Sequence, residues 1–285
     1  MDDRFPTLKV DEIDACRLTA LDGETFVVAD GEINMACRLK LLPGADKLFI
    51  MLHGAVDRVK TPLPTFARWN YGKLLGGHVL AVCDPTLSLH DELRLGWFLG
   101  TAKIDPTKTL IDTANHFGNQ LSINASNIIF YGSSGGGFTA LIAASSQKIG
   151  RAICINPQVD VSRYYANPAR LAAMVFDSGH TLSQIRATFP TRWSALEAIK
   201  VGAASGNDLR IFYAQNTVDD DFHFANHFTP FCDSLNAKID GGFSANGKIL
   251  THLYSSSKGH GAEPPELVKV ITSEGLNHLI PSKPQ

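Results

Sequence analysis

The sequence predicts an α/β fold: a mostly parallel, doubly wound sheet with antiparallel N-terminal strands and a helical cap insertion. Three observations lead to this prediction. Short apolar runs recur along the chain, amphipathic stretches separate most of them, and about fifty residues after one run lack a clear strand. Strands that alternate with helices form parallel sheets, and a chain of 285 residues is long enough to bury a large core.

The apolar runs predict the strands. Runs such as LFIML, VLAVC and IIFY are continuously apolar, as expected for strands that are buried on both faces of a parallel sheet. The first strands are shorter or more alternating and are joined by Asp-Gly turns, which is typical of an antiparallel lead-in. We predict strands at residues 15–21, 26–29, 33–41, 47–52, 78–83, 127–131, 151–155, 209–214 and 248–254.

The stretches between the strands predict helices. They lie at residues 87–99, 108–121, 136–147, 223–236 and 265–274. Residues 156–207 contain further helical pieces at 166–176, 182–189 and 191–201. An insertion placed after a strand lies at the carboxyl edge of the sheet, where ligand sites form. We therefore expect one domain over residues 1–285, with a helical cap or lid at 156–207.

Composition excludes several classes of function. With 26 basic and 28 acidic side chains the net charge is −2, which gives no electrostatic case for a nucleic-acid partner, since such a partner calls for a clustered basic face. Five scattered cysteines form no C-x-x-C pair, and four lie in or beside apolar stretches, so we expect them to be buried and reduced. The N-terminus lacks a signal-peptide pattern, and no apolar run reaches the roughly 18 residues of a membrane span. We expect a soluble, cytoplasmic protein.

The segment 127–144 carries the most informative motif. It reads as a buried strand, a glycine-rich turn and an apolar helix, and the turn fits G-x-S-x-G with Ser134 at its centre. A nucleophile on such a turn adopts a strained backbone, and Gly132 and Gly136 let the strand and the helix approach. Gly135 can offer its N–H to an oxyanion. The alternative is a connecting or phosphate-binding turn, but no P-loop pattern is present.

A serine nucleophile needs a base and a carboxylate that orients this base. His260 lies between two glycines directly after the last predicted strand, so it is the expected base. Asp219 follows the preceding strand and is the expected acid; Asp220 is the second choice. The adjacent aspartates could instead cap the next helix.

A second oxyanion donor should come from the loop after the strand at 47–52. His53 and Gly54 follow that strand, and the amide of Ala55 is the expected donor beside that of Gly135. His223 and His227, four residues apart, could alternatively ligate a metal, although no H-E-x-x-H motif is present. We therefore expect no metal.

Together, LHGA at 52–55, YGSSGGGF at 131–138, the Asp219 turn and KGHG at 258–261 resemble the α/β-hydrolase superfamily across nearly the whole chain. The resemblance implies the α/β-hydrolase fold and a Ser-His-Asp triad that works through an acyl-enzyme, without metal or organic cofactor. The GSSGG elbow is similar to that of small esterases, of peptidase-like members and of glycan-associated enzymes that include capsule O-acetyltransferases. HGA in place of HGGG departs from the lipase pattern.

The expected function is serine-dependent acyl transfer from a small-molecule or glycan ester, either to water, as in an esterase, or to a sugar hydroxyl, as in an O-acetyltransferase with an acyl-CoA donor. Two alternatives remain. The first is a catalytically silent scaffold that serves binding or assembly, and the second is a metal-dependent hydrolase that uses His223 and His227.

Overall fold

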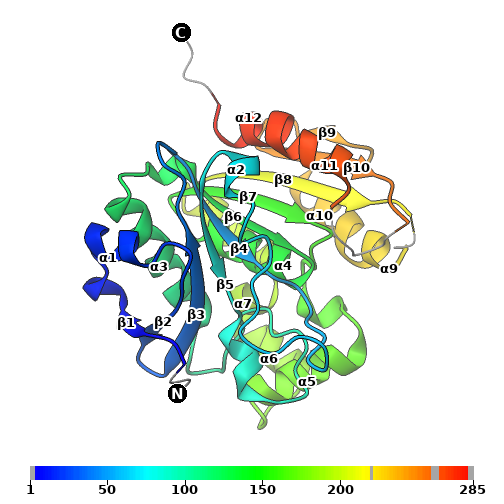
Figure 1. The fold of residues 1–285 in the computed structure, drawn as a ribbon. Coiled ribbons are helices and arrows are strands. Elements are labelled where there is room, and N and C mark those ends of the chain that lie inside the picture. The colour runs from blue at the N-terminus through cyan, green and yellow to red at the C-terminus, as the bar shows by residue number, and fades with distance from the viewer. Residues whose placement is uncertain (1–3, 219–220, 258–262, 282–285) are drawn as a thin grey trace.

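The computed structural model describes residues 4–218, 221–257 and 263–281 of the chain, and its strands form one sheet (Figure 1). Among the described residues, the strand order across the sheet is β1-β2-β3-β5-β4-β6-β7-β8-β10-β9. The strands are Thr7–Lys9 (β1), Thr25–Asp30 (β2), Ile33–Lys40 (β3), Leu48–Leu52 (β4), His78–Val82 (β5), Ile128–Ser133 (β6), Ile149–Ile155 (β7), Asp208–Asn216 (β8), Gly242–Phe243 (β9) and Ile249–Tyr254 (β10).

The sheet is mostly parallel. Strands β5, β4, β6, β7, β8 and β10 run in the same direction, while β3 is antiparallel to both β2 and β5. Strand β4 lies between β5 and β6. The chain therefore passes from β4 to β5 on one side and then crosses back to β6 on the other, which makes β4 the point where the strand order reverses. In doubly wound sheets such a switch point opens a crevice at the carboxyl ends of the strands. Here these ends belong to β4, which precedes His53, and to β6, which precedes Ser134.

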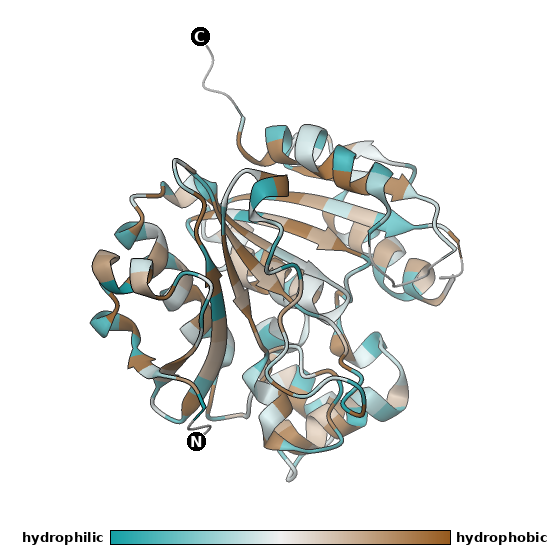
Figure 2. Cartoon of the chain, in the orientation of Figure 1, coloured by the Kyte–Doolittle hydropathy of each residue, from teal (hydrophilic) through white to brown (hydrophobic). Residues whose placement is uncertain are grey.

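Helices cover both faces of the sheet. Alternate residues of β4 point to opposite sides: Ile50 joins an apolar cluster with α1, α3, α4, α8 and α10, whereas Phe49 and Met51 join one with α2, α11 and α12. Figure 2 shows the strands mostly in apolar colours and hydrophilic residues on the outward faces of helices. The helices are α1 Ala15–Ala20, α2 Gly72–Leu75, α3 Pro106–Gln120, α4 Gly135–Ser145, α5 Ala166–Phe176, α6 Leu182–Thr188, α7 Pro190–Trp193, α8 Ala195–Ala204, α9 Asp221–His223, α10 Thr229–Leu235, α11 Pro265–Val270 and α12 Leu276–Leu279.

Shorter helical segments complete the fold. These are η1 Val10–Glu12, η2 Pro85–Leu89, η3 Ala125–Asn127, η4 Val161–Arg163, η5 Phe224–Phe228 and η6 Ile271–Gly275. Segments η5 and η6 are π-helical turns that continue α9 into α10 and α11 into α12. The expected helices at 223–236 and 265–274 are therefore each present as a continuous helical stretch with a π-turn inside.

The strand predicted at residues 15–21 is wrong, because this segment forms helix α1. Asp14 caps the helix by accepting a hydrogen bond from the backbone N–H of Arg17 at 2.7 Å. An aspartate cap satisfies one of the amide donors that a helix start leaves open. Leu18 is the one buried residue of this helix. The alternation of apolar and polar residues that suggested a strand therefore does not reflect one buried face.

The helix predicted at residues 87–99 is also wrong. The segment forms η2 and then a loop with positive φ angles at Trp97 (52°) and Phe98 (53°). The Asp84 carboxylate accepts a hydrogen bond from the N–H of Phe98 at 2.9 Å, and the Thr86 hydroxyl accepts one from the N–H of Gly100 at 2.9 Å. These side chains take the place of the backbone acceptors that a helix would supply.

The predicted insertion at 156–207 holds α5, α6, α7 and α8. The piece expected at 191–201 is divided at Ser194, which lies between α7 and α8. Helix α8 packs against α4. Cys37, Cys83, Cys154 and Cys232 are buried and free, whereas Cys16 is exposed. Among the described residues, no helix combines the length and the apolar character that crossing a bilayer requires.

Candidate active site

Ser134 lies on the turn between the end of β6 and the start of α4. Its backbone angles are φ 54° and ψ −122°, a conformation that non-glycine residues rarely adopt. The turn is held to the next strand, because the N–H of Ser134 donates to the carbonyl of Ile155 at 2.9 Å. Strain of this kind costs on the order of 1–3 kcal/mol and persists only where the surroundings enforce it. The sequence correctly places Ser134 on a strand–turn–helix junction; its chemical role stays a prediction.

Glycines around Ser134 are required by close backbone contacts. A Cβ atom on Gly132 would lie 2.2 Å from the carbonyl carbon and oxygen of Gly136. A Cβ atom on Gly136 would lie 2.4 Å from the carbonyl oxygen of Leu52, at the end of β4. No side chain fits at such distances, so the spacing of the motif has a steric origin.

The loop after β4 runs directly beside Ser134. A Cβ atom built on Gly54 would be 3.1 Å from the Ser134 Cβ and 3.7 Å from its Oγ. Ala55 is exposed, and Gly135 is buried as the first residue of α4. The two residues named as oxyanion donors therefore belong to segments that meet at Ser134, while their hydrogen bonding to an oxyanion stays a prediction.

His53 fixes the start of this loop. Its Nδ1 lies 2.7 Å from the carbonyl oxygen of Gly54, and its Nε2 accepts a hydrogen bond from the N–H of Asp84 at 2.9 Å. A ring nitrogen that accepts leaves the other to donate, so His53 is neutral here. Burial lowers the pKa of His53, and burial raises the pKa of the neighbouring Asp84 carboxyl.

The predicted acid and base, Asp219 and His260, lie outside the described residues, as does the second choice, Asp220. The strands that precede them are adjacent and parallel, with Asn216 of β8 opposite Tyr254 of β10. The Asn216 side chain donates to the carbonyl of Ser256 at 2.7 Å and accepts from the Ser256 N–H at 3.0 Å. The two strands therefore end side by side at the sheet edge that carries Ser134, and the triad itself stays a prediction.

An ion pair lies next to the elbow. Arg68 donates to the Oγ of Ser133 at 3.0 Å, and its Nε donates to the carboxylate of Glu263 at 2.8 Å. Both charged side chains are almost fully buried. The Arg68 guanidinium also lies 5.0 Å from the ring centre of Tyr131. Glu263 is the first described residue after the segment that holds His260.

Gln158, which no sequence pattern predicted as a site residue, contacts Ser134 directly. Its side-chain Nε2 donates to the Ser134 Oγ at 2.8 Å, and its Oε1 accepts from the indole N–H of Trp97 at 3.1 Å. The residue is fully buried at 0% exposure. A lone glutamine three residues beyond a strand has no local pattern that identifies it, so the sequence offered no signal.

His223 and His227 face each other on one side of their helix, as their spacing predicts, with ring centres 5.1 Å apart. Tyr164 packs against both rings, and the His223 Nε2 lies 3.5 Å from the Nε2 of Gln158. Within residues 4–218, 221–257 and 263–281, no group of three or more His, Cys, Asp or Glu side chains could hold a metal ion.

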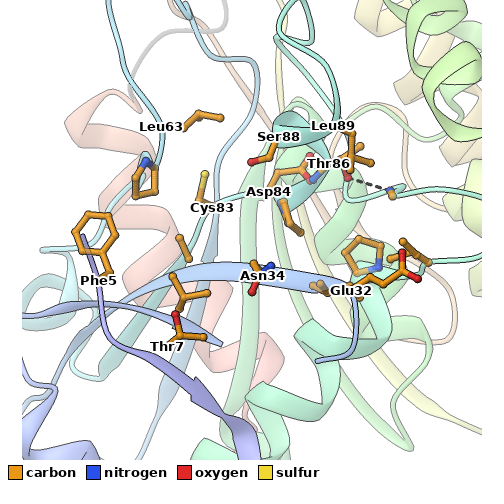
Figure 3. Close-up of a pocket in the computed structure, with 18 residues that line it drawn as sticks. Phe5, Thr7, Glu32, Asn34, Leu63, Cys83, Asp84, Thr86, Ser88 and Leu89 are labelled. Atoms are coloured by element: carbon orange, nitrogen blue, oxygen red, sulfur yellow. Dashed lines mark hydrogen bonds between the residues drawn. The ribbon is translucent and has the colours of Figure 1, made fainter. Parts of the chain in front are cut away.

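A cavity of about 350 Å³ lies beside Asp84, between the N-terminal strands and the segment after β5 (Figure 3). Figure 3 shows Phe5 and Thr7 on one side of it and Thr86 and Leu89 on another. None of the described residues that line this cavity belongs to the turn at Ser134. The cavity is therefore distinct from the serine site, although Asp84 borders it and also donates its N–H to His53.

No protein-family model and no curated protein sequence matches the chain. Solved structures do match it. One is a chain of the glycosylation-associated Gap123 complex from Streptococcus agalactiae (TM-score 0.61, 14% identity), where the match covers 87% of this chain and 45% of that one. The chain thus spans less than half the length of this match.

Two further matches span nearly their whole length. The capsule O-acetyltransferase of Neisseria meningitidis serogroup A matches with a TM-score of 0.59 and 18% identity, over 91% of this chain and 97% of that one. An S-formylglutathione hydrolase from Agrobacterium tumefaciens matches with a TM-score of 0.57 and 14% identity, over 90% and 93%. These likenesses confirm the predicted α/β-hydrolase fold.

Proposed function

We propose that the protein is a serine-dependent acyl-transfer enzyme that acts on a carboxylic ester through an acyl-enzyme. The backbone of Ser134 carries this proposal. A serine held at φ 54° and ψ −122°, between a buried strand and a helix whose first residue is Gly135, presents its hydroxyl at the carboxyl edge of the sheet. The matching hydrolase and O-acetyltransferase structures support the same class of chemistry by analogy of fold.

In the proposed reaction, the Oγ of Ser134 forms a bond to the acyl carbon while its proton passes to His260, which Asp219 orients. The carbonyl π-electrons move to oxygen, where the N–H groups of Ala55 and Gly135 stabilise the charge. The carbonyl re-forms, the bond to the leaving alcohol breaks, and His260 gives the alcohol its proton. Water or a sugar hydroxyl then attacks the acyl-enzyme by the reverse steps.

The acceptor decides whether the enzyme is an esterase or an O-acetyltransferase. A transferase would take its acyl group from a donor such as acyl-CoA, whose thiol leaves in place of the alcohol. No metal or resident organic cofactor enters either route. The likeness to a capsule O-acetyltransferase over almost the whole of both chains supports a sugar hydroxyl as one acceptor to test.

A fluorophosphonate probe tests the proposal, because it modifies activated serines. We expect the native protein to be labelled and Ser134→Ala to be inert. Ser146→Ala is the control, since it removes an exposed hydroxyl just beyond the C-terminal end of α4 and should keep the label. Turnover of an acyl ester or acyl-CoA is then followed with and without a sugar. Free acid as the product indicates an esterase, and acylated sugar indicates an O-acetyltransferase.

The second candidate is a catalytically silent α/β-hydrolase scaffold. The matching streptococcal chain belongs to a complex of glycosylation-associated proteins, which favours an assembly role as the alternative. A folded native protein that neither takes the label nor turns over an ester would favour the scaffold over the enzyme.

A further inference from the structure

Gln158 lies between Trp97 and Ser134, and its amide can point only one way. The indole N–H of Trp97 is a donor without acceptor capacity, so the group that faces it at 3.1 Å must be the amide oxygen. The amide NH₂ therefore faces the Ser134 Oγ, at 2.8 Å. Trp97 is itself fixed, since it is 2% exposed and its carbonyl accepts a hydrogen bond from Thr139 at 3.2 Å.

The backbone holds Gln158 against the same serine. The N–H of Gln158 donates to the Ser134 carbonyl at 3.3 Å, and two residues earlier Asn156 turns the chain with φ 44°. Asn156 is anchored by its side chain, which accepts from the N–H of Asn216 at 2.7 Å. A Cβ atom on Gly137 would lie 2.7 Å from the Cβ of Pro157, so this turn packs closely on the start of α4. Gln158 is thus positioned by rigid elements on both sides.

The hydrogen bond has a direction that matters for chemistry. The Oγ of Ser134 accepts from Gln158, which leaves the hydroxyl proton to be donated elsewhere. A donor aimed at an oxygen stabilises the negative form of that oxygen more than the neutral form. Beside a fully buried donor such as Gln158 this preference is larger than in water, because a fixed donor replaces mobile solvent.

We infer that Gln158 is a catalytic residue whose side-chain amide stabilises the negative charge that develops on the Ser134 Oγ as it loses its proton. The inference rests on the proposed function. The amide keeps both its hydrogens throughout: the proton leaves Oγ for the base, and the new bond forms from Oγ to the acyl carbon. Gln158 therefore serves the nucleophile, whereas the two backbone donors serve the carbonyl oxygen.

The first test replaces the amide without changing its size. Gln158→Met keeps the length of the side chain but removes the donor, and we expect fluorophosphonate labelling of Ser134 to slow by about 100-fold, as when one donor to a reacting oxygen is lost. Gln120→Met, at the end of α3, is the matched control and should label at the native rate. Thermal unfolding of both variants verifies that they are folded.

A second variant gives a readout that a structural role would not produce. In Gln158→Glu, an ionised carboxylate cannot donate to the Oγ, but a protonated carboxyl can, while its other oxygen still accepts from Trp97. The labelling rate of Gln158→Glu, divided by the native rate at the same pH, should therefore rise as the pH falls. The division removes any pH dependence that the two proteins share; the His223 ring, whose Nε2 lies 3.5 Å from the Gln158 Nε2, also faces the substituted side chain.

The outcomes separate the two claims. A folded native protein that takes no label refutes the proposed function and the inference with it. A native protein that labels, together with a Gln158→Met variant that labels within twofold of it, overturns the inference alone. A Gln158→Glu ratio that does not change with pH overturns it as well.

Discussion

Arg68 and Glu263 form a buried ion pair between residues 195 positions apart, and the same guanidinium donates to the Ser133 Oγ at 3.0 Å. Through Arg68, this ion pair and its hydrogen bond join three segments that the proposed acyl transfer requires. Arg68 follows the loop of Gly54, Ser133 precedes the proposed nucleophile, and Glu263 follows the segment that holds His260. Removing one charge should therefore affect both stability and the site.

We expect Glu263→Gln to lower the free energy of unfolding by about 3 kcal/mol, because it leaves the buried Arg68 charge without its partner. Urea denaturation measures this. The control is Asp112→Asn, which breaks an exposed pair with Lys108 and should change the stability little, because solvent screens this pair. A loss for Glu263→Gln no greater than that of the control would contradict the argument.

Gly54→Ala tests the closeness of the oxyanion loop to Ser134. The new Cβ would lie 3.1 Å from the carbonyl oxygen of Ser133 and from the Ser134 Cβ, so the loop must move by a few tenths of an ångström. We expect labelling of Ser134 to slow by about 10-fold or more, because small misplacements of a catalytic group are costly. Gly179→Ala is the matched control, since its Cβ would meet only the Asp177 carboxylate, at 3.4 Å. Equal labelling of the two variants would show that the loop does not need its present position.

Gly132→Ala tests the strand–helix approach. The added Cβ would lie 2.2 Å from the backbone of Gly136, which cannot rotate away as a side chain could. We expect a loss of about 3 kcal/mol in the free energy of unfolding, at the upper end of overpacking costs. Chemical denaturation measures the loss, and near-native stability would mean that β6 and α4 can separate without penalty.

Much of the fold could be predicted because its signals are local. Continuous apolar runs identified β4 to β8, and the glycine spacing identified the turn at Ser134, where only hydrogen fits in place of a side chain. The failures arose where a side chain competes with the backbone. Asp14 caps a helix in a segment whose apolar residues alternate as in a strand. The Asp84 carboxylate accepts a hydrogen bond from the N–H of Phe98, which is distant in sequence.

The candidate site was predictable only in part for the same reason. The spacing of His223 and His227 placed both rings on one helix face. Gln158 was missed because its contact with Ser134 depends on how β7 runs beside β6, which no local pattern encodes. Contacts between strand ends are set by the sheet, so single polar residues after strands deserve testing even without a motif.

Metal removal separates the proposed serine chemistry from a hydrolase that uses His223 and His227. We expect labelling and ester turnover to be unchanged after dialysis against a chelator, since no step of the proposed reaction uses a metal. His227→Asn would remove a ligand from a metal site, so this variant should lose ester turnover only if the metal-dependent alternative holds. Loss of turnover on chelation, restored by added Zn²⁺, would favour the metal-dependent alternative.

The His53 imidazole should make stability depend on pH in a direction that its environment fixes. Burial lowers the pKa of folded His53 below its ordinary value of 6.5. As the pH falls below that value, the unfolded chain binds a proton at His53 before the folded chain does, so stability decreases until the pH reaches the lowered pKa. The slope from one such group is at most about 1.4 kcal/mol per pH unit.

Asp84 acts in the opposite direction, because burial raises the pKa of its carboxyl and the folded chain binds that proton first. The comparison therefore uses His53→Asn, which removes one titrating group and leaves Asp84 and the other histidines in place. Urea denaturation at a series of pH values from about 7 down to 5 should show the native protein losing more stability than this variant. Parallel curves for the two proteins would mean that His53 has the same pKa in the folded and unfolded chains, against the hydrogen bonds that hold it neutral.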